Sequence, residues 1–294
     1  MAEATKRYAV VTGANKGIGF GICKQLACNG ITVLLTARDE KRGLEAVEKL
    51  KESAANLVFH QLEVTDSASI ASLADFIRTH FGKLDILVNN AGISGVNADG
   101  EALAASGIAE NGVNVDWNKL LTQSYELSEA TIKTNYYGAI KTSQALIPLL
   151  QLSDSPRIVN VSSSMGKLEN LPNGWAKEAL SDVKNLSEEK IDVVLHRFLE
   201  DFKEGSFESK GWPAVMSAYI VSKAALNAYT RVLAKKYPSF CINAVCPGYI
   251  KTDLTYNTGV LTVDEGAEAV VRLALLPHSG PSGLFFSRSE ERPF

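Results

Sequence analysis

Short apolar runs alternate with longer amphipathic stretches along this chain of 294 residues. The runs are continuous rather than alternating and are rich in β-branched residues, which is typical of parallel strands buried on both faces. They cover residues 8–12, 32–36, 58–62, 86–88, 158–161, 242–245 and 283–286. We therefore expect about seven buried strands.

Helical patterns fill most of the intervals between these runs. They cover residues 19–29, 41–53, 67–81, 125–150 and 217–236. Such alternation predicts an α/β fold, a doubly wound parallel sheet with helices on both faces. No repeat or linker divides the chain, so we expect one domain over residues 1–294.

Two irregular regions interrupt the alternation. Residues 95–123 are polar, contain glycine and follow the fourth run, whose carboxyl end faces the ligand crevice in such a sheet. We expect Val96 to line the substrate side of this crevice, with Ala98 and Asp99 beside it. The second region is an insertion, residues 166–215, that contains a further helix.

The insertion helix has clear start signals. Ser187 can cap it, and Glu188 and Glu189 suit the positive end of the helix dipole. Its apolar residues recur at helical spacing and form one stripe: Ile191, Val194, Leu195, Phe198, Leu199 and Phe202. We expect the stripe to dock on its own chain, with binding of a partner protein as the alternative.

A glycine-rich turn joins the first predicted strand to the first predicted helix. Residues 12–19 are TGANKGIG, with Gly13, Gly17 and Gly19 spaced as GxxxGxG. Glycines at this place allow backbone N–H groups to approach a pyrophosphate at the helix N-terminus, and Asn15, Lys16 and Ile18 lie in the same turn. A glycine-rich turn without a ligand is the alternative.

Charges near this turn bear on the choice of cofactor. A 2′-hydroxyl favours an acidic residue directly after the second strand, whereas a 2′-phosphate favours cations. Arg38 follows the second run, and Asp39 comes one residue later. Arg38 and Lys16 can hold the phosphate from two sides, so we expect NADP(H); two solvated surface cations are the alternative.

Tyr219 and Lys223 lie four residues apart in a helical pattern and so share one face. An ammonium beside a phenol favours the phenolate and lowers the pKa of the phenol. The pair is either a tuned proton donor or an ordinary contact on the helix surface.

Composition and charge exclude several classes. A net charge of −3 and a pI near 5.9 give no basic surface for nucleic acid or anionic membranes. We expect no signal peptide and no membrane span, and free cysteines indicate a cytoplasmic protein. The histidines are scattered, so we expect no metal site: His60, His80, His196 and His278.

Several short motifs occur together in a characteristic order. They are TGxxxGxG at 12–19, NNAG at 89–92, Asn135, SSS at 162–164, YxxxK at 219–223 and Pro-Gly at 247–248. In this order the chain resembles the short-chain dehydrogenase/reductase family, whose fold is a Rossmann sheet. The NKGIGF turn, the long insertion and the GWP motif at 211–213 resemble the branch of monomeric carbonyl reductases and plant menthone and salutaridine reductases.

The resemblance implies a role for each matched residue. Tyr219 would be the general acid, Ser163 would hydrogen-bond the substrate oxygen, and Asn135 would hold a water that links Lys223 to a proton relay. Lys223 would also contact the nicotinamide ribose. Further cofactor contacts would come from Glu63, Val64, Asn90, Ile250 and Thr252, and a further substrate contact from Ser164. Many relatives have Asp where this chain has Glu63, so the adenine contacts there would be rearranged.

The implied activity is NADPH-dependent reduction of a ketone or aldehyde on a bulky apolar terpenoid, alkaloid or xenobiotic. An ene-reductase on the same scaffold and a non-catalytic NADPH sensor are the alternatives. The insertion would cover the surface through which other members assemble, so we expect a monomer. The insertion also brings apolar residues near the serine and tyrosine in sequence, and these are candidates for either pocket or core: Met165, Leu168, Leu171, Trp175, Trp212 and Met216.

Overall fold

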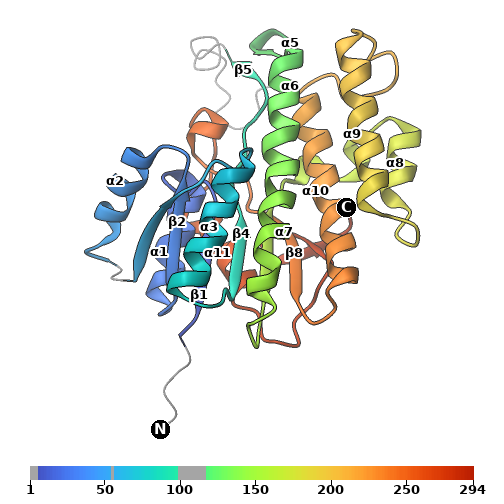
Figure 1. Cartoon of the computed structure of the whole chain (residues 1–294). Coiled ribbons are helices and arrows are strands. Elements are labelled where there is room, and N and C mark those ends of the chain that lie inside the picture. The colour runs from blue at the N-terminus through green and yellow to red at the C-terminus, as the bar shows by residue number, and fades with distance from the viewer. Residues whose placement is uncertain (1–5, 54–55, 99–116) are drawn as a thin grey trace.

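An eight-stranded sheet forms the centre of the molecule, in the order β3-β2-β1-β4-β7-β8-β9-β10 (Figure 1). The computed structural model describes residues 6–53, 56–98 and 117–294. The strands are β1 (Tyr8–Val11), β2 (Thr32–Ala37), β3 (Leu57–Gln61), β4 (Ile86–Asn89), β7 (Arg157–Val161), β8 (Cys241–Cys246), β9 (Phe285–Ser287) and β10 (Glu290–Arg292). All but β10 run parallel to their neighbours, and β10 pairs antiparallel with β9.

Helices cover both faces of this sheet. One face carries α1 (Gly17–Cys28), α2 (Glu40–Leu50) and α11 (Val263–Ala274). The other carries α3 (Ser67–His80), α6 (Tyr125–Ile132), α7 (Ala139–Leu150) and α10 (Ser217–Lys236). Side chains alternate along each strand, so Val10 enters one core and its neighbours Ala9 and Val11 enter the other. The predicted doubly wound α/β fold is confirmed.

The strand order reverses next to β1, which lies between β2 and β4. In open parallel sheets the ligand crevice opens at the carboxyl ends of the strands around such a reversal. The segments that follow β1, β4, β7 and β8 therefore converge on one edge. These segments contain most of the candidate residues.

The long helical pattern of residues 125–150 is not one regular helix. α6 and α7 are joined by a π-helical turn, Lys133–Gly138, that contains Asn135. The Asn135 side chain is hydrogen-bonded at both ends to the backbone of Ile93, outside the helix. Wider turns of this kind are frequent at functional sites.

The insertion packs on the same chain, as predicted. It contains α8 (Gly174–Ser181) and α9 (Glu188–Lys203), which lie beside α10 in Figure 1. Ser187 caps α9 by accepting a hydrogen bond from the Lys190 N–H. Within the stripe, Ile191, Val194, Leu195 and Phe198 are fully buried in the same core as α6 and α10.

A small ribbon extends from the carboxyl edge of the sheet. β5 (Asn97–Ala98) pairs antiparallel with β6 (Leu121–Thr122), which directly follows α5 (Trp117–Leu120). The candidate Asp99 lies outside the described residues. This ribbon places Leu121 beside the segment that follows β4.

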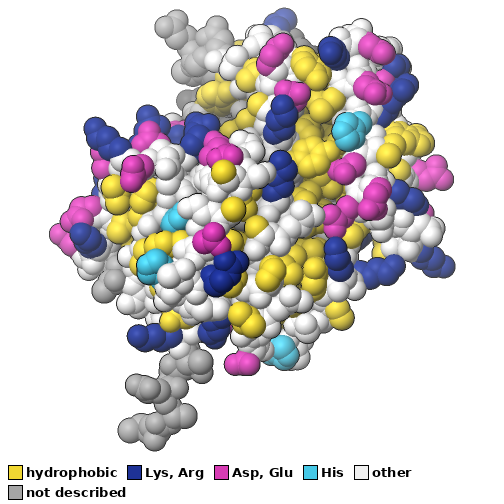
Figure 2. Space-filling view, in the orientation of Figure 1, with side chains coloured by type: hydrophobic (Ala, Val, Ile, Leu, Met, Phe, Trp, Pro, Cys, Tyr) yellow, Lys and Arg dark blue, Asp and Glu magenta, His cyan; other side chains and the backbone are white. Residues whose placement is uncertain are grey.

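The surface is mixed in charge. Figure 2 shows Lys and Arg side chains interspersed with Asp and Glu over the face that carries α3 and α7. Hydrophobic side chains gather on the same face between α6 and α9. Within the described part of the chain, no helix is both long and apolar enough to cross a membrane.

Candidate active site

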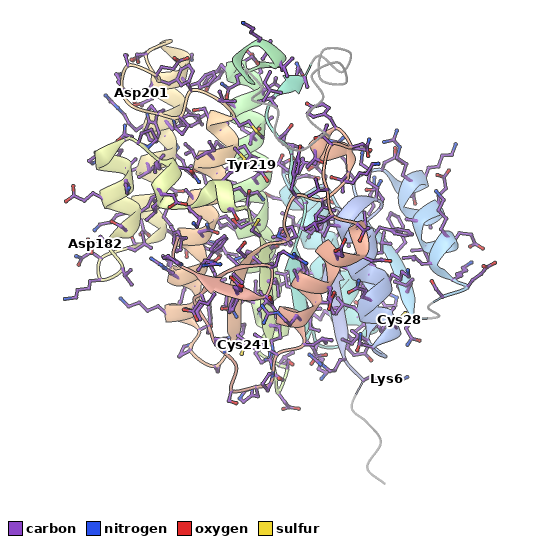
Figure 3. All side chains as sticks on the ribbon, turned by 180° about the vertical axis from the view of Figure 1, so that it is seen from behind. Lys6, Cys28, Asp182, Asp201, Tyr219 and Cys241 are labelled. Atoms are coloured by element: carbon purple, nitrogen blue, oxygen red, sulfur yellow. The ribbon has the colours of Figure 1, made fainter. Side chains whose placement is uncertain are left out.

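A cavity of about 570 Å³ opens at the carboxyl edge of the sheet. Its wall is formed by the segments after β1, β4, β7 and β8 and by the first turns of α10. The polar groups include Ser163, Tyr219 and Lys223. Much of the remaining wall is apolar, including Ile18, Val96, Leu121, Val161, Met165, Met216, Ile220 and Leu254. Figure 3 shows Tyr219 inside the molecule and far from Cys241, which begins β8 at the opposite edge of the sheet.

Tyr219 and Lys223 face this cavity from α10 and are both buried. The Lys223 Nζ atom lies 5.7 Å from the centre of the Tyr219 ring. It donates a hydrogen bond of 2.8 Å to the Val161 carbonyl at the end of β7. Ser163 lines the same cavity and lies near enough to Tyr219 to influence its ionisation. The pair is therefore not a contact on an exposed helix surface.

Burial dominates the ionisation of both groups. It raises the pKa of Tyr219 to about 12, although the neighbouring Ser163 hydroxyl acts in the other direction. Burial also lowers the pKa of Lys223 to about 8. The expected lowering of the phenol pKa by Lys223 is thus not what this structure shows. The reason is that the phenolate and the ammonium both lose hydration in the cavity wall.

Ser163 reaches Tyr219 because its turn lies directly against α10. Gly166 makes this approach possible, since a Cβ atom there would come within 2.6 Å of the Lys223 backbone. The Ser163 Oγ atom also accepts a hydrogen bond from the Met165 N–H at 3.1 Å. Ser163 and Met165 line the cavity, whereas the candidate Ser164 between them is outside the described lining. The backbone of Ser163 is extended and a tight turn over Ser164–Gly166 follows it. This explains why Ser163 and Met165 line the cavity and Ser164 does not.

Asn135 lies beside Lys223. Its Oδ1 atom accepts from the Ile93 N–H at 2.8 Å, and its Nδ2 atom donates to the Ile93 carbonyl at 2.9 Å and to the Ser222 hydroxyl at 3.1 Å. A Cβ atom on Gly92 would lie 3.2 Å from Asn135 Oδ1 and 3.6 Å from Lys223 Nζ. Both side chains therefore converge on the backbone of Gly92.

The glycine turn after β1 fits a phosphate group. Gly13 has φ +63° and packs so closely that a Cβ atom would lie 2.9 Å from Ala91 Cα. Asn90 donates to the carbonyls of Thr12 and Gly13 and ties β4 to the turn. α1 starts at Gly17 without a side-chain cap, so its first N–H groups are available to an anion. Gly19 is buried against Asn90 in the same turn.

Lys16 and Arg38, the two cations predicted to hold a 2′-phosphate, each have a carboxylate neighbour. Lys16 Nζ lies 2.6 Å from Asp253, and Arg38 lies 3.7 Å from Glu63. Both cations are largely exposed, and neither ion pair joins one to the other. The predicted clamp on a 2′-phosphate therefore stays a prediction.

The remaining candidates fall into two groups. Ile18, Val96, Ile250 and Thr252 line the cavity, and Asn15 is half-buried in the glycine turn. Val64 has its side chain in the core, where a Cβ atom on Gly138 would lie 2.8 Å from it. Val64 is not part of the cavity lining, so its predicted cofactor contact stays a prediction.

The apolar residues in and beside the insertion also divide into two groups. Met165 and Met216 line the cavity. Leu168, Leu171 and Trp212 are buried in the core, and Trp175 is about half exposed. Closeness in sequence to Ser163 or Tyr219 therefore does not by itself predict which residues line the cavity.

Several lining residues were missed, above all in the segment after Thr252. Leu254 and Tyr256 belong to the cavity wall, and the Tyr256 hydroxyl donates to the Val96 carbonyl at 3.1 Å. Tyr256 and Asn257 both have positive φ. The sequence offers no motif there, because this contact spans 160 positions.

Comparison with known proteins identifies the family. A model described as short chain dehydrogenase matches residues 7–175. The chain belongs to the short-chain dehydrogenase family. A second model, described as Enoyl-(Acyl carrier protein) reductase, matches residues 205–280. This family member is an oxidoreductase that acts on CH–OH or carbonyl groups.

Its relatives include plant dehydrogenases and reductases. The chain is 62% identical to (+)-neomenthol dehydrogenase of Arabidopsis thaliana, and the match covers 100% of both chains. Salutaridine reductase from Papaver somniferum has a similar structure, with 55% identity, coverage of 96% of this chain and 99% of that chain, and a TM-score of 0.91. Menthone neomenthol reductase from Mentha piperita matches with 53% identity, coverage of 98% and 100%, and a TM-score of 0.85.

An animal enzyme also matches at lower identity. It is an NADPH-bound carbonyl reductase from chicken fatty liver, 27% identical, with a TM-score of 0.67 and coverage of 99% of this chain and 100% of that chain. The similarity therefore extends over the whole chain, insertion included.

Proposed function

We propose that this family member uses NADPH to reduce a ketone or aldehyde, carried on a bulky apolar molecule, to an alcohol. The observation that carries the proposal is that Ser163, Tyr219 and Lys223 line one largely apolar cavity, with the Lys223 ammonium 5.7 Å from the centre of the Tyr219 ring. Tyr219 is a proton donor, Ser163 is a hydrogen-bond donor and Lys223 is a cation, and all three face the same cavity. This set suits a carbonyl oxygen that becomes negatively charged.

The dinucleotide would bind along the same edge of the sheet. The glycine turn and the start of α1 would hold the pyrophosphate, as the close packing at Gly13 and the uncapped helix start indicate. Lys16 and Arg38 would face the 2′-phosphate, and Lys223 the nicotinamide ribose. Other contacts would come from Asn15, Ile18, Glu63, Val64, Asn90, Ile250 and Thr252. The reduced nicotinamide supplies the hydride when it is bound.

Ser163 and Tyr219 would stabilise and protonate the oxygen atom of the substrate. The Ser163 hydroxyl would donate a hydrogen bond to this oxygen and stabilise its growing negative charge. Tyr219 would then give its phenolic proton to the oxygen, which completes the alcohol. A raised pKa keeps the phenol protonated at neutral pH, and an alkoxide is a stronger base than a phenolate.

Lys223 would stabilise the phenolate that is left behind. Its ammonium is close to the ring and stays mostly protonated near neutral pH, since its pKa is about 8. Asn135, which meets Lys223 at Gly92, would hold the water that returns a proton from solvent. The reverse reaction would use Tyr219 as the base.

The cavity wall favours a neutral hydrocarbon skeleton. Within its described lining there is no carboxylate to pair with a cationic ligand, and Lys223 is buried and hydrogen-bonded. A terpenoid ketone fits these surroundings better than a protonated alkaloid amine does. The names of the menthone and neomenthol relatives agree with this choice, whereas the name of the salutaridine reductase relative does not.

One observation favours a second activity, the reduction of an enone double bond. The match of residues 205–280 to an enoyl reductase model covers the helix that carries Tyr219 and the segment after β8. Tyr219 and Ser163 in the cavity wall argue for the carbonyl, because carbonyl reduction ends with a proton on oxygen, whereas the enolate formed from an enone takes its final proton at carbon. We therefore rank enone reduction second.

A substrate screen tests the proposal. Oxidation of NADPH and of NADH would be followed with menthone, an alkaloid ketone, a simple aldehyde and a cyclic enone, and the products identified by mass spectrometry. We expect an alcohol from menthone, with NADPH preferred over NADH. A saturated ketone from the enone with no alcohol from any carbonyl would establish the second activity instead.

A further inference from the structure

The helix that carries Tyr219 begins in an unusual way. Met216 occupies its N-cap position and makes no side-chain cap hydrogen bond. The backbone of Met216 is left-handed, with φ +50° and ψ +36°. Such a conformation costs a non-glycine residue about 1–2 kcal/mol, so other contacts must hold the turn.

Gln123 holds this turn from a distant part of the chain. Its Oε1 atom accepts from the Ser217 N–H at 2.7 Å, and its Nε2 atom donates to the Ala214 carbonyl at 2.7 Å. Both bonds are shorter than the usual distance of about 2.9–3.0 Å. One amide thus supplies the missing cap of α10 and closes the backbone around Met216.

The same amide joins two walls of the cavity. Met216 lines the cavity, and Tyr219 follows within one turn of the helix. Gln123 directly follows β6, whose Leu121 lines the cavity from the other side. Gln123 itself is not part of the described lining. It therefore fixes the start of α10 against the β5–β6 ribbon without touching the substrate space.

We propose that Gln123 is a positioning residue for the reduction. It sets where Tyr219 and Met216 stand relative to the substrate by fixing the first turn of α10. The expected effect on kcat rests on the proposed carbonyl reduction. The expected effect on the first turn of α10 can be measured without turnover. Small displacements of a reacting group are enough to lower a rate severalfold.

Two variants test the proposal. Gln123→Leu keeps most of the volume and removes both hydrogen bonds, and Gln123→Glu keeps the acceptor for the Ser217 N–H. We expect Gln123→Leu to lower kcat for menthone about tenfold, with the Kd for NADPH unchanged within about twofold. Gln123→Glu should recover part of the lost kcat, since its carboxylate still accepts from the Ser217 N–H but cannot donate to the Ala214 carbonyl. Hydrogen exchange of residues 214–222 should be fastest in the Leu variant and intermediate in the Glu variant.

Gln25→Leu is the matched control. It removes a comparable bond, from a glutamine side chain to the Asp264 carbonyl at 2.8 Å, between α1 and α11. Neither kcat nor exchange of residues 214–222 should change. Wild-type kcat and exchange in Gln123→Leu would overturn the proposal, as would a parallel loss of NADPH binding and melting temperature that Gln123→Glu does not rescue. If the wild type reduced no carbonyl, the proposed function would fail, while the exchange experiment would still decide the role of Gln123.

Discussion

Tyr219 is buried in surroundings that keep its phenol protonated until a stronger base forms beside it. Burial raises the pKa of this phenol to about 12, and burial lowers the pKa of Lys223 to about 8. At neutral pH the phenol is therefore protonated and the ammonium is mostly charged. This state suits reduction, in which a proton is given to an oxygen that has just gained negative charge.

The pH dependence of reduction follows from these values. Tyr219 keeps its proton throughout the range in which Lys223 loses its own, so the alkaline decline belongs to Lys223. We expect kcat/KM for the ketone to be level near neutrality and to fall as the pH rises through about 8. Initial rates at saturating NADPH would show this. A profile that stays level to about pH 10 would contradict the role given to Lys223.

Gly166 offers a second test at the same scale. A methyl group at this position would press on the Lys223 backbone at 2.6 Å and push the Ser163 turn away from Tyr219. We expect Gly166→Ala to lower stability by about 1–3 kcal/mol and to lower kcat by more than tenfold. Urea unfolding and steady-state kinetics measure the two effects.

Gly174→Ala is the control, since a Cβ atom at Gly174 would meet nothing within 4 Å. It should leave kcat unchanged and alter stability by less than about 1 kcal/mol. Equal effects of the two substitutions would show that close packing at Gly166 does not position Ser163.

At the scale of elements, one buried carboxylate joins α9 to the segment that follows it in the insertion. Asp201 on α9 accepts hydrogen bonds from Trp212 Nε1 at 2.9 Å and Lys210 Nζ at 2.6 Å, with Arg197 Nε at 3.2 Å. Burial alone would raise the pKa of Asp201, but the hydrogen bonds and the neighbouring cations outweigh it and lower the pKa. Figure 3 shows Asp201 at the outer end of the insertion, away from Tyr219.

We expect Asp201→Asn to destabilise the protein by about 2–4 kcal/mol, because two cations lose their buried partner. The stabilisation by Asp201 is complete above the ordinary pKa of 3.8 and is lost as the pH falls through the lower value of the folded state. Urea unfolding at neutral pH and near pH 3 would therefore show a smaller difference in acid.

Asp182→Asn, at an exposed pair with Lys190 in the same insertion, is the control and should cost less than about 1 kcal/mol. If both substitutions had the same small effect, the buried network would not stabilise the insertion. Tyr219 lies apart from both carboxylates, so kcat per folded molecule should change in neither variant.

The sequence predicted some elements well and others not at all, for physical reasons. The seven apolar runs match the seven parallel strands because burial on both faces leaves a continuous apolar pattern. β10 has no such pattern, since its three residues are charged and exposed. The π-helical turn at Asn135 was also hidden, because the residues on both sides of it are helical.

The site was predictable where chemistry and local spacing coincide. Tyr219 and Lys223 share one face of a helix, and Ser163 follows a strand. Gln123 and Tyr256 could not be found in this way. Their hydrogen bonds span 91 to 160 positions, and no residue near them belongs to a recognisable motif. Burial also reversed the expected direction of the Tyr219 pKa, which no spacing could show.

At the scale of the whole molecule, the insertion determines which surface is exposed. α9 packs on α6 and α10 and buries Ile191, Val194 and Phe198 there. An apolar helix surface left open at this place would favour association with a second copy. We propose that this family member acts as a monomer for this reason.

Light scattering coupled to size-exclusion chromatography tests the proposal. We expect one species of about 31.7 kDa at micromolar concentrations, with or without NADPH. A stable species of twice this mass would show that a surface other than the one under α9 joins two copies. No substitution is needed, so an unfolded variant cannot confuse the result.

The most direct test of the whole account is Tyr219→Phe, which removes one hydroxyl and keeps the ring that packs in the cavity wall. NADPH binding would be measured by fluorescence titration, and ketone reduction by single-turnover kinetics with the same protein. We predict that the Kd for NADPH stays within about twofold of wild type while reduction slows by more than about a thousandfold. Reduction at a rate close to wild type would contradict the central claim that the Tyr219 hydroxyl supplies the proton.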